Sequence, residues 1–274
     1  MKWFDSPTRV KLCPYTALAI VALGFSLARA ADVPVSEVFV RIRNDKGEER
    51  LTAEKDFRRN ITEWKIAGPA FVAITSSPWP TGLVPVFPLA SESGFQLRRL
   101  PPRGQENDVE PLFFALPPPD EPHATNIAGP WSCAATNAHG SKHYLDWELA
   151  NEGESVAGRF SQSSEYRVAF ITGGTFRSNR FALNVDYINN RYVLNGEWRG
   201  GKLLGSWRHL DNEENGTWEG TRPTSKAAVP PATESVALFE WRRGDERRYS
   251  IETSLSESGW TRAARPLCRV WRGK

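Results

Sequence analysis

The sequence predicts an all-β protein in which a compact block interrupts a domain formed by both ends of the chain. Glycine (21) and proline (20) recur throughout the 274 residues, and short runs rich in Val, Phe, Tyr, Trp and Thr lie between them. Beyond the first 30 residues, only 52–64 shows a short helical pattern. Two proline-rich stretches, 117–122 and 221–235, enclose a block of about one hundred residues, which is the length of a domain.

Residues 1–30 have the three parts of a secretory signal. A basic start through Lys11 precedes an apolar run that ends near Leu27, and Ala28-Arg29-Ala30 has the small-x-small form cut by signal peptidase. The alternative is an uncleaved membrane anchor, for which the apolar run is short. We therefore expect a secreted or periplasmic protein, cleaved after Ala30, with no membrane span once the signal is removed.

Removal of this segment changes the charge balance. The chain has 35 basic and 32 acidic residues, of which residues 1–30 hold four basic and one acidic, so 31 of each remain. Nucleic-acid binding needs a surplus of positive charge, and nucleic acid is therefore not an expected partner. The composition, 40% hydrophobic and 24% charged, also excludes a disordered chain or a multi-span membrane protein.

Two cysteines, Cys133 and Cys268, follow the signal segment. An oxidising compartment would permit one disulfide, which would tie distant parts of the chain together. The alternative is a pair of buried thiols that pack as small hydrophobic groups. The sequence leaves both open because the pairing geometry is invisible from it.

The block at 125–222 repeats a motif of glycine, any residue and an aromatic residue. In a strongly coiled antiparallel sheet, glycine lets a strand bend, and the aromatic side chain two positions later points to the same face and fills the core. The pattern predicts an up-and-down barrel of seven or eight strands and resembles the avidin and lipocalin style of barrel. The six copies are Gly129-Pro-Trp131, Gly158-Arg-Phe160, Gly174-Thr-Phe176, Gly196-Glu-Trp198, Gly205-Ser-Trp207 and Gly216-Thr-Trp218.

The flanking segments repeat a second pattern. Residues 37–45 (EVFVRIRND), 84–92 (VPVFPLASE) and 236–244 (VALFEWRRG) align on Phe39, Phe87 and Phe239, and the units end in PAFVAI, PLFFAL and PLCRVW. Three such units suit a β-trefoil, because no single unit covers its own apolar face. We expect units at 37–83, 84–122 and 236–274, a discontinuous trefoil-like domain from 31–122 and 236–274, an inserted barrel at 125–222, and a linker at 223–235.

The first unit is similar to the lectin-like β-trefoil repeats of secreted bacterial proteins. The resemblance lies in VFVRIRNDKGEERLT, followed by Trp64 and PAFVAI, and the three units cover about 125 of 274 residues. In that family a histidine and an aromatic-Tyr-Thr run follow the turn, whereas this chain has ERLT at 49–52, FQL at 95–97 and YS at 249–250. The resemblance implies a non-enzymatic, carbohydrate-binding protein, and the departure puts a shared ligand site in doubt.

The third unit has the most unusual composition. Residues 236–274 hold nine basic and five acidic residues, and after the signal segment arginine outnumbers lysine 24 to 7. Aromatic rings stack on pyranose faces, while Asp and Arg hydrogen-bond hydroxyl or acidic groups. The predicted ligand-binding residues are Trp241, Asp245, Arg247, Tyr249 and Trp260. Alternatively, these arginines pair with acidic residues of the first unit or of the barrel.

No motif for catalysis, nucleotides or a cofactor is present. His139, His143 and Asp146 have a spacing that could bind metal on a helix, but they lie in a predicted hairpin, so no metal site is expected. We expect a non-enzymatic protein, without cofactor, whose partner is a glycan or cell-envelope polysaccharide.

Two other functions stay open. The barrel could hold a small apolar ligand in an interior cavity. The protein could instead be an exported protease inhibitor that presents the loop 101–110. The carbohydrate hypothesis predicts that Trp241 and Trp260 are exposed together. The expected lining of the barrel cavity is Trp131, Trp147, Phe160, Trp198, Trp207 and Trp218.

Overall fold

A computed structural model describes residues 35–46, 49–57, 63–75, 80–91, 94–102, 109–119, 126–162, 168–187, 190–223 and 230–273. The predicted signal segment and residues 103–108 of the loop at 101–110 lie outside the described residues. Within the described ranges the protein is all-β, as predicted, with nineteen strands, one helix, α1 (Glu54–Phe57), and one 3-10 helix, η2 (Ala232–Glu234). In this part of the chain no helix is long and apolar enough to cross a bilayer.

The predicted helix at 52–64 is wrong for most of its described length. Thr52 and Ala53 belong to strand β2, and Trp64 begins strand β3, so only the four residues of α1 are helical. Residues 58–62 lie outside the described residues. Thr52 pairs with Val40 of the first strand, and this sheet pairing overrides the weak helical period.

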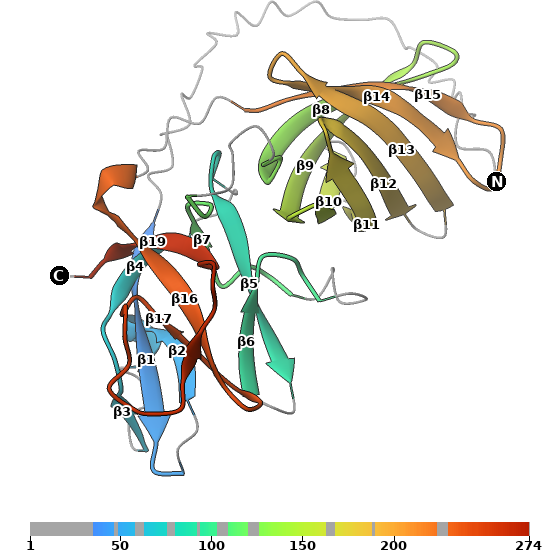
Figure 1. Ribbon diagram of the computed structural model, residues 1–274. Coiled ribbons are helices and arrows are strands. Elements are labelled where there is room, and N and C mark those ends of the chain that lie inside the picture. The colour runs from blue at the N-terminus through green and yellow to red at the C-terminus, as the bar shows by residue number, and fades with distance from the viewer. Residues whose placement is uncertain are drawn as a thin grey trace, which may run out of the picture. The chain divides into compact units, whose positions relative to one another are not determined.

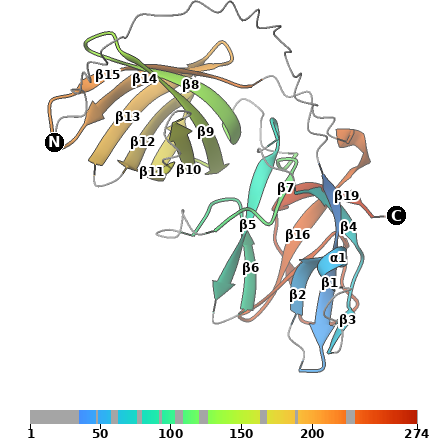
Figure 2. The same cartoon turned by 180° about the vertical axis from the view of Figure 1, so that it is seen from behind.

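Eight consecutive strands close into an antiparallel barrel, seen in Figures 1 and 2. Each strand pairs with its neighbours in sequence, and the first pairs with the last to close the circle. This confirms the predicted barrel, with eight strands where the sequence predicted seven or eight. The strands are β8 (Gly129–Asn137), β9 (Lys142–Glu152), β10 (Ser155–Gln162), β11 (Val168–Arg177), β12 (Arg180–Tyr187), β13 (Asn190–Arg199), β14 (Lys202–His209) and β15 (Asn215–Thr221).

The strand register explains why glycine and an aromatic residue recur together. Gly205 lies opposite Trp218, and Trp207 lies opposite Gly216. The motif at 205–207 and the motif at 216–218 therefore each place an indole against the glycine of the other motif. A Cβ atom would lie 2.9 Å from Trp218 Nε1 at Gly205, and 2.7 Å from Trp207 Nε1 at Gly216. Each glycine therefore makes room for the ring on the neighbouring strand, which covers its backbone.

Aromatic side chains fill much of the barrel core. Trp131 and Trp147 are fully buried, and the Trp131 indole donates a 2.8 Å hydrogen bond to the carbonyl oxygen of Ile127. The ring centroids of Trp147 and Trp218 lie 4.6 Å apart, and those of Phe181 and Trp218 lie 5.1 Å apart. The rings thus pack against one another across neighbouring parts of the barrel wall.

The other strands form one eleven-stranded hydrogen-bonded network, which we call the flanking sheet. Strands from before and after the barrel share it, because Trp271 of the last strand pairs with Val72. The network contains β1 (Ser36–Asn44), β2 (Glu49–Ala53), β3 (Trp64–Ile66), β4 (Phe71–Ile74), β5 (Val84–Ser91), β6 (Gly94–Arg98), β7 (Phe113–Ala115), β16 (Ser235–Arg243), β17 (Glu246–Ser250), β18 (Thr261–Arg262) and β19 (Cys268–Arg272).

The same pairing pattern occurs three times in the flanking sheet. Hairpins β1–β2, β5–β6 and β16–β17 open the three units, and each unit's first strand also pairs with its last, β4, β7 or β19. These last strands meet: β4 pairs with both β7 and β19, and Leu116 bridges to Arg269. The shared core repeats in threes: Phe39, Val86 and Leu238; Phe71, Phe113 and Cys268; Ala73, Ala115 and Val270; Leu51, Leu97 and Tyr249.

The alignment on three phenylalanines is wrong by one residue in two units. Phe39 lies opposite Phe71, but the positions opposite Phe113 and Cys268 are Val86 and Leu238, not Phe87 and Phe239. Successive strand residues point to opposite faces, so a one-residue offset exchanges the core face for the other face.

The two cysteines are free, buried and located in different cores. Cys133 packs inside the barrel, and Cys268 packs in the core of the flanking sheet. The buried-thiol alternative is therefore correct and the disulfide alternative is wrong. Burial raises the pKa of Cys268 to about 12 and also raises the pKa of Cys133, which keeps both thiols protonated at neutral pH.

Candidate functional site

The β16–β17 hairpin divides the predicted ligand-binding residues between two faces. Glu240 lies opposite Tyr249 and Arg242 lies opposite Arg247, so these four side chains share one face, while Trp241 lies opposite Arg248 on the other. We call these the glutamate face and the tryptophan face. Among the predicted residues, Arg247 and Tyr249 belong to the glutamate face, and Asp245 is exposed in the turn between the strands.

Trp241 and Trp260 are not exposed together. Trp241 is only 6% exposed, and Trp260 is half-buried. The guanidinium carbons of Arg248 and Arg243 lie 4.2 and 4.8 Å from the Trp260 ring centroid. The ring already stacks on cations of its own chain, so this pair does not offer the open aromatic surface that the sequence predicted.

The tryptophan face also carries an ion-pair network that links the first and third units. Glu49 accepts hydrogen bonds from Arg248 Nε at 2.8 Å and Arg248 Nη2 at 2.7 Å, and one from Arg43 Nε at 2.7 Å. The side chain of Arg248 is only 3% exposed. The sequence left open whether the third-unit arginines bind a ligand or pair with acidic residues of the first unit. For Arg248, the structure shows pairing with Glu49.

Glu257 extends the network. It accepts hydrogen bonds from Arg248 Nη2 at 3.2 Å and from Arg43 Nη2 at 3.0 Å. These two bonds stabilise the ionised carboxylate and lower the pKa of Glu257 to about 2. The network therefore has a stabilising role and occupies arginines that would otherwise be available to a ligand.

On the glutamate face, one carboxylate positions several polar groups. Tyr249 donates a 2.9 Å hydrogen bond to Glu240 and accepts one at 2.8 Å from the backbone N–H of Leu97 in β6. Glu240 also accepts a hydrogen bond from Arg242 Nε and lies 3.7 Å from Arg247 Nε. Burial, with the Glu240 carboxylate, raises the pKa of Tyr249, so its hydroxyl stays a donor at neutral pH.

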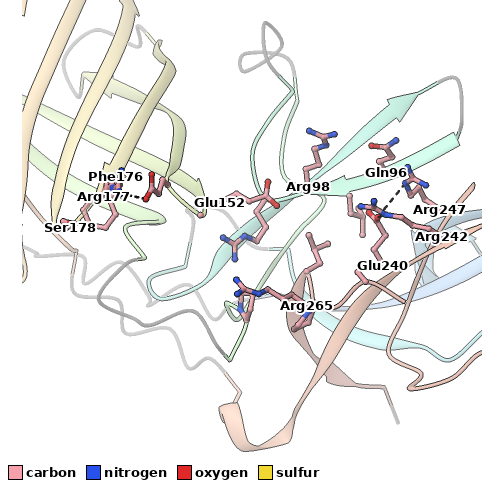
Figure 3. A pocket seen from close by; sticks show the side chains of 18 residues that line it. Gln96, Arg98, Glu152, Phe176, Arg177, Ser178, Glu240, Arg242, Arg247 and Arg265 are labelled. Atoms are coloured by element: carbon pink, nitrogen blue, oxygen red, sulfur yellow. Dashed lines mark hydrogen bonds and ion pairs between the residues drawn. The ribbon is translucent and has the colours of Figure 1, made fainter. Parts of the chain in front are cut away.

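This face lines a cleft of about 950 Å³. Figure 3 shows Glu240 beside Arg242 and Arg247, with Gln96 and Arg98 of β6 near them. The side chain of Arg242 is 60% exposed, and Arg98 is exposed as well. All its described cationic residues are arginines: Arg98, Arg99, Arg177, Arg242, Arg247 and Arg265; the acidic residues are Glu152, Glu154 and Glu240.

Sequence reasoning found only one residue of the lining, Arg247. Arg98 and Gln96 were missed because they belong to the second unit, and Arg242 was passed over in favour of its neighbour Trp241. The arginine pairs at 98–99, 242–243 and 247–248 were a visible signal. Both Arg98 and Arg99 line the cleft, but only Arg242 and Arg247 of the other two pairs do. That selection depends on strand register, and register is a tertiary property.

No protein-family model, curated protein or solved structure matches this chain. The functional assignment therefore depends on the chemistry of the cleft and on the repeated architecture around it.

Proposed function

We propose that the protein is an exported, lectin-like carbohydrate-binding protein whose ligand occupies the arginine-lined cleft. The observation that carries the proposal is the cleft itself, about 950 Å³ in volume and lined by six arginines and three glutamates. Ligand pockets for small molecules have volumes of roughly 300–1,000 Å³. Guanidinium, carboxylate and amide groups together provide both donors and acceptors for sugar hydroxyls.

The trefoil assignment is part of the same proposal. Its support is the threefold recurrence of hairpins, of first-to-last strand pairing and of core positions in the flanking sheet. Three equivalent units close one apolar core and leave their hairpins at one end, which is the physical logic of a trefoil. The inserted barrel is then a second module with a hydrophobic core of its own.

Binding without catalysis suits the carboxylate at the centre of the glutamate face. Glu240 is bonded to Tyr249 and Arg242 and is close to Arg247, so it positions donors instead of presenting a free acid or base. A glycosidase of the common type needs two carboxyl groups placed on either side of the scissile bond. The contacts of Glu240 therefore support a role for this carboxylate in binding.

The apolar-ligand hypothesis finds less support. The Trp218 ring centroid lies 4.6 Å from that of Trp147 and 5.1 Å from that of Phe181, and these rings occupy space that such a ligand would need. The described part of the loop at 101–110 adds nothing specific to the inhibitor hypothesis, since residues 103–108 lie outside the described residues.

A calorimetric titration of the purified protein with neutral and acidic oligosaccharides tests the proposal. We expect Arg98→Ala and Arg242→Ala each to weaken binding about tenfold, because each removes charged hydrogen-bond donors. Arg208→Ala changes an exposed arginine of β14 outside the cleft, and Asp245→Asn changes a residue predicted from sequence alone; both should bind normally. Normal binding by both cleft variants would remove the cleft from consideration.

A further inference from the structure

The geometry points to a carboxylated saccharide, with uronic-acid groups along its chain, as the ligand of this cleft. This inference rests on the proposed function and adds the chemical class of the ligand. It starts from the absence of lysine among the described cations that line the cleft. A guanidinium is a planar fork that matches the two oxygens of a carboxylate, whereas an ammonium is a point charge.

Two of the cleft arginines are placed to present such a fork. Arg242 is held by Glu240 through Nε, which orients the guanidinium while the side chain remains 60% exposed. Arg98 stands exposed on β6. Arg247 is more heavily used by the protein, because its Nη1 donates to the carbonyl oxygen of Gly244 at 3.2 Å. We assign carboxylate recognition to Arg98 and Arg242, which lie on the same side of the cleft as Glu240.

The acidic members of the lining select against a densely charged polymer. The six arginines and three glutamates leave a net charge of +3, a modest surplus spread over the cleft. Glu152 is exposed there, and a carboxylate can only accept hydrogen bonds. A ligand that fits must combine separated anionic groups with hydroxyl donors, and an oligouronide has both. A heavily sulfated chain has few hydroxyl groups left and places more negative charge beside the glutamates.

The test compares four probes by titration calorimetry at fixed ionic strength: oligogalacturonate, its methyl ester, dextran sulfate and neutral dextran. We expect oligogalacturonate to bind, and its methyl ester, which lacks the charge, to bind at least about tenfold more weakly. Arg242→Lys keeps the charge but loses the fork, so it should weaken oligogalacturonate binding severalfold. Arg208→Ala is the matched control and should have no effect.

The outcomes separate this inference from the function on which it rests. Equal binding of the ester and the acid, lost in Arg98→Ala, would overturn the uronate assignment and leave carbohydrate binding intact. If dextran sulfate binds more tightly than oligogalacturonate, and Arg242→Lys binds with the affinity of the parent protein, the uronate assignment would be replaced by unspecific polyanion binding. Failure of all four probes and of the wider oligosaccharide panel would contradict both proposals.

Discussion

Gly216 offers the sharpest test of the packing inside the barrel. A Cβ atom at this position would lie 2.0 Å from the backbone carbonyl oxygen of Thr136 and 2.7 Å from Trp207 Nε1. Both distances are far shorter than a van der Waals contact, and the first partner is a backbone atom of the paired strand, which cannot rotate away. Gly216→Ala must therefore shift β15 away from β8 and also displace the Trp207 indole.

Overpacking of this kind costs about 1–3 kcal/mol of unfolding free energy. For a chain of this size each kcal/mol lowers Tm by roughly 2–4 °C, so we expect a decrease of about 2–12 °C. Gly173→Ala is the matched control in the same barrel, because a Cβ atom there meets nothing within 4 Å. It should change stability by less than about 1 kcal/mol.

Thermal unfolding followed by near-ultraviolet circular dichroism measures both variants, because the barrel core contains buried tryptophans. Urea denaturation at a fixed temperature gives the unfolding free energies by a second method. The reasoning is refuted if Gly216→Ala unfolds at the temperature of the parent protein, or if Gly173→Ala destabilises the protein equally. Either result would mean that the close approach of Gly216 to the backbone of β8 and to the Trp207 indole does not constrain this part of the barrel.

Three further predictions concern the flanking sheet and the thiols. Glu49→Gln leaves a buried guanidinium without its bidentate partner and should lower the unfolding free energy by about 3 kcal/mol in urea titration, whereas Glu219→Gln, on an exposed pair, should cost less than about 1 kcal/mol. Because the pKa of Glu257 is lowered to about 2, its contribution to stability is complete above its unfolded pKa and is lost as the pH falls from about 4 to 2. Glu257→Gln should therefore reduce the loss of unfolding free energy over this pH range. An unchanged pH dependence would show that the Glu257 carboxylate does not contribute to it. Cys133 and Cys268 should resist a thiol reagent in the native protein and react in denaturant, and rapid native labelling would contradict their burial.

The local patterns of the sequence were sufficient for the fold class and for the barrel. Glycine, an aromatic residue two positions later and a turn signal are all local, so the motif from Gly129 to Trp218 indicated a closed antiparallel meander without knowledge of any contact. The helix predicted at 52–64 was wrong because its conformation depends on a contact that is not local. A strand partner outside the window, Val40, decided the conformation of Thr52.

The sequence by itself determined which residue types are available to a ligand: many arginines, few lysines, and tryptophans close to them in the third unit. Only the tertiary structure decided which of them act together. Strand alternation turned Trp241 away from Tyr249, and Trp260 stacks with Arg243 and Arg248. A hydrogen bond between units joins the backbone N–H of Leu97 to Tyr249, and Arg98 of that distant segment lines the same cleft. A local pattern states what a side chain is, but the face it occupies depends on register, and register is set by partners far away in the chain.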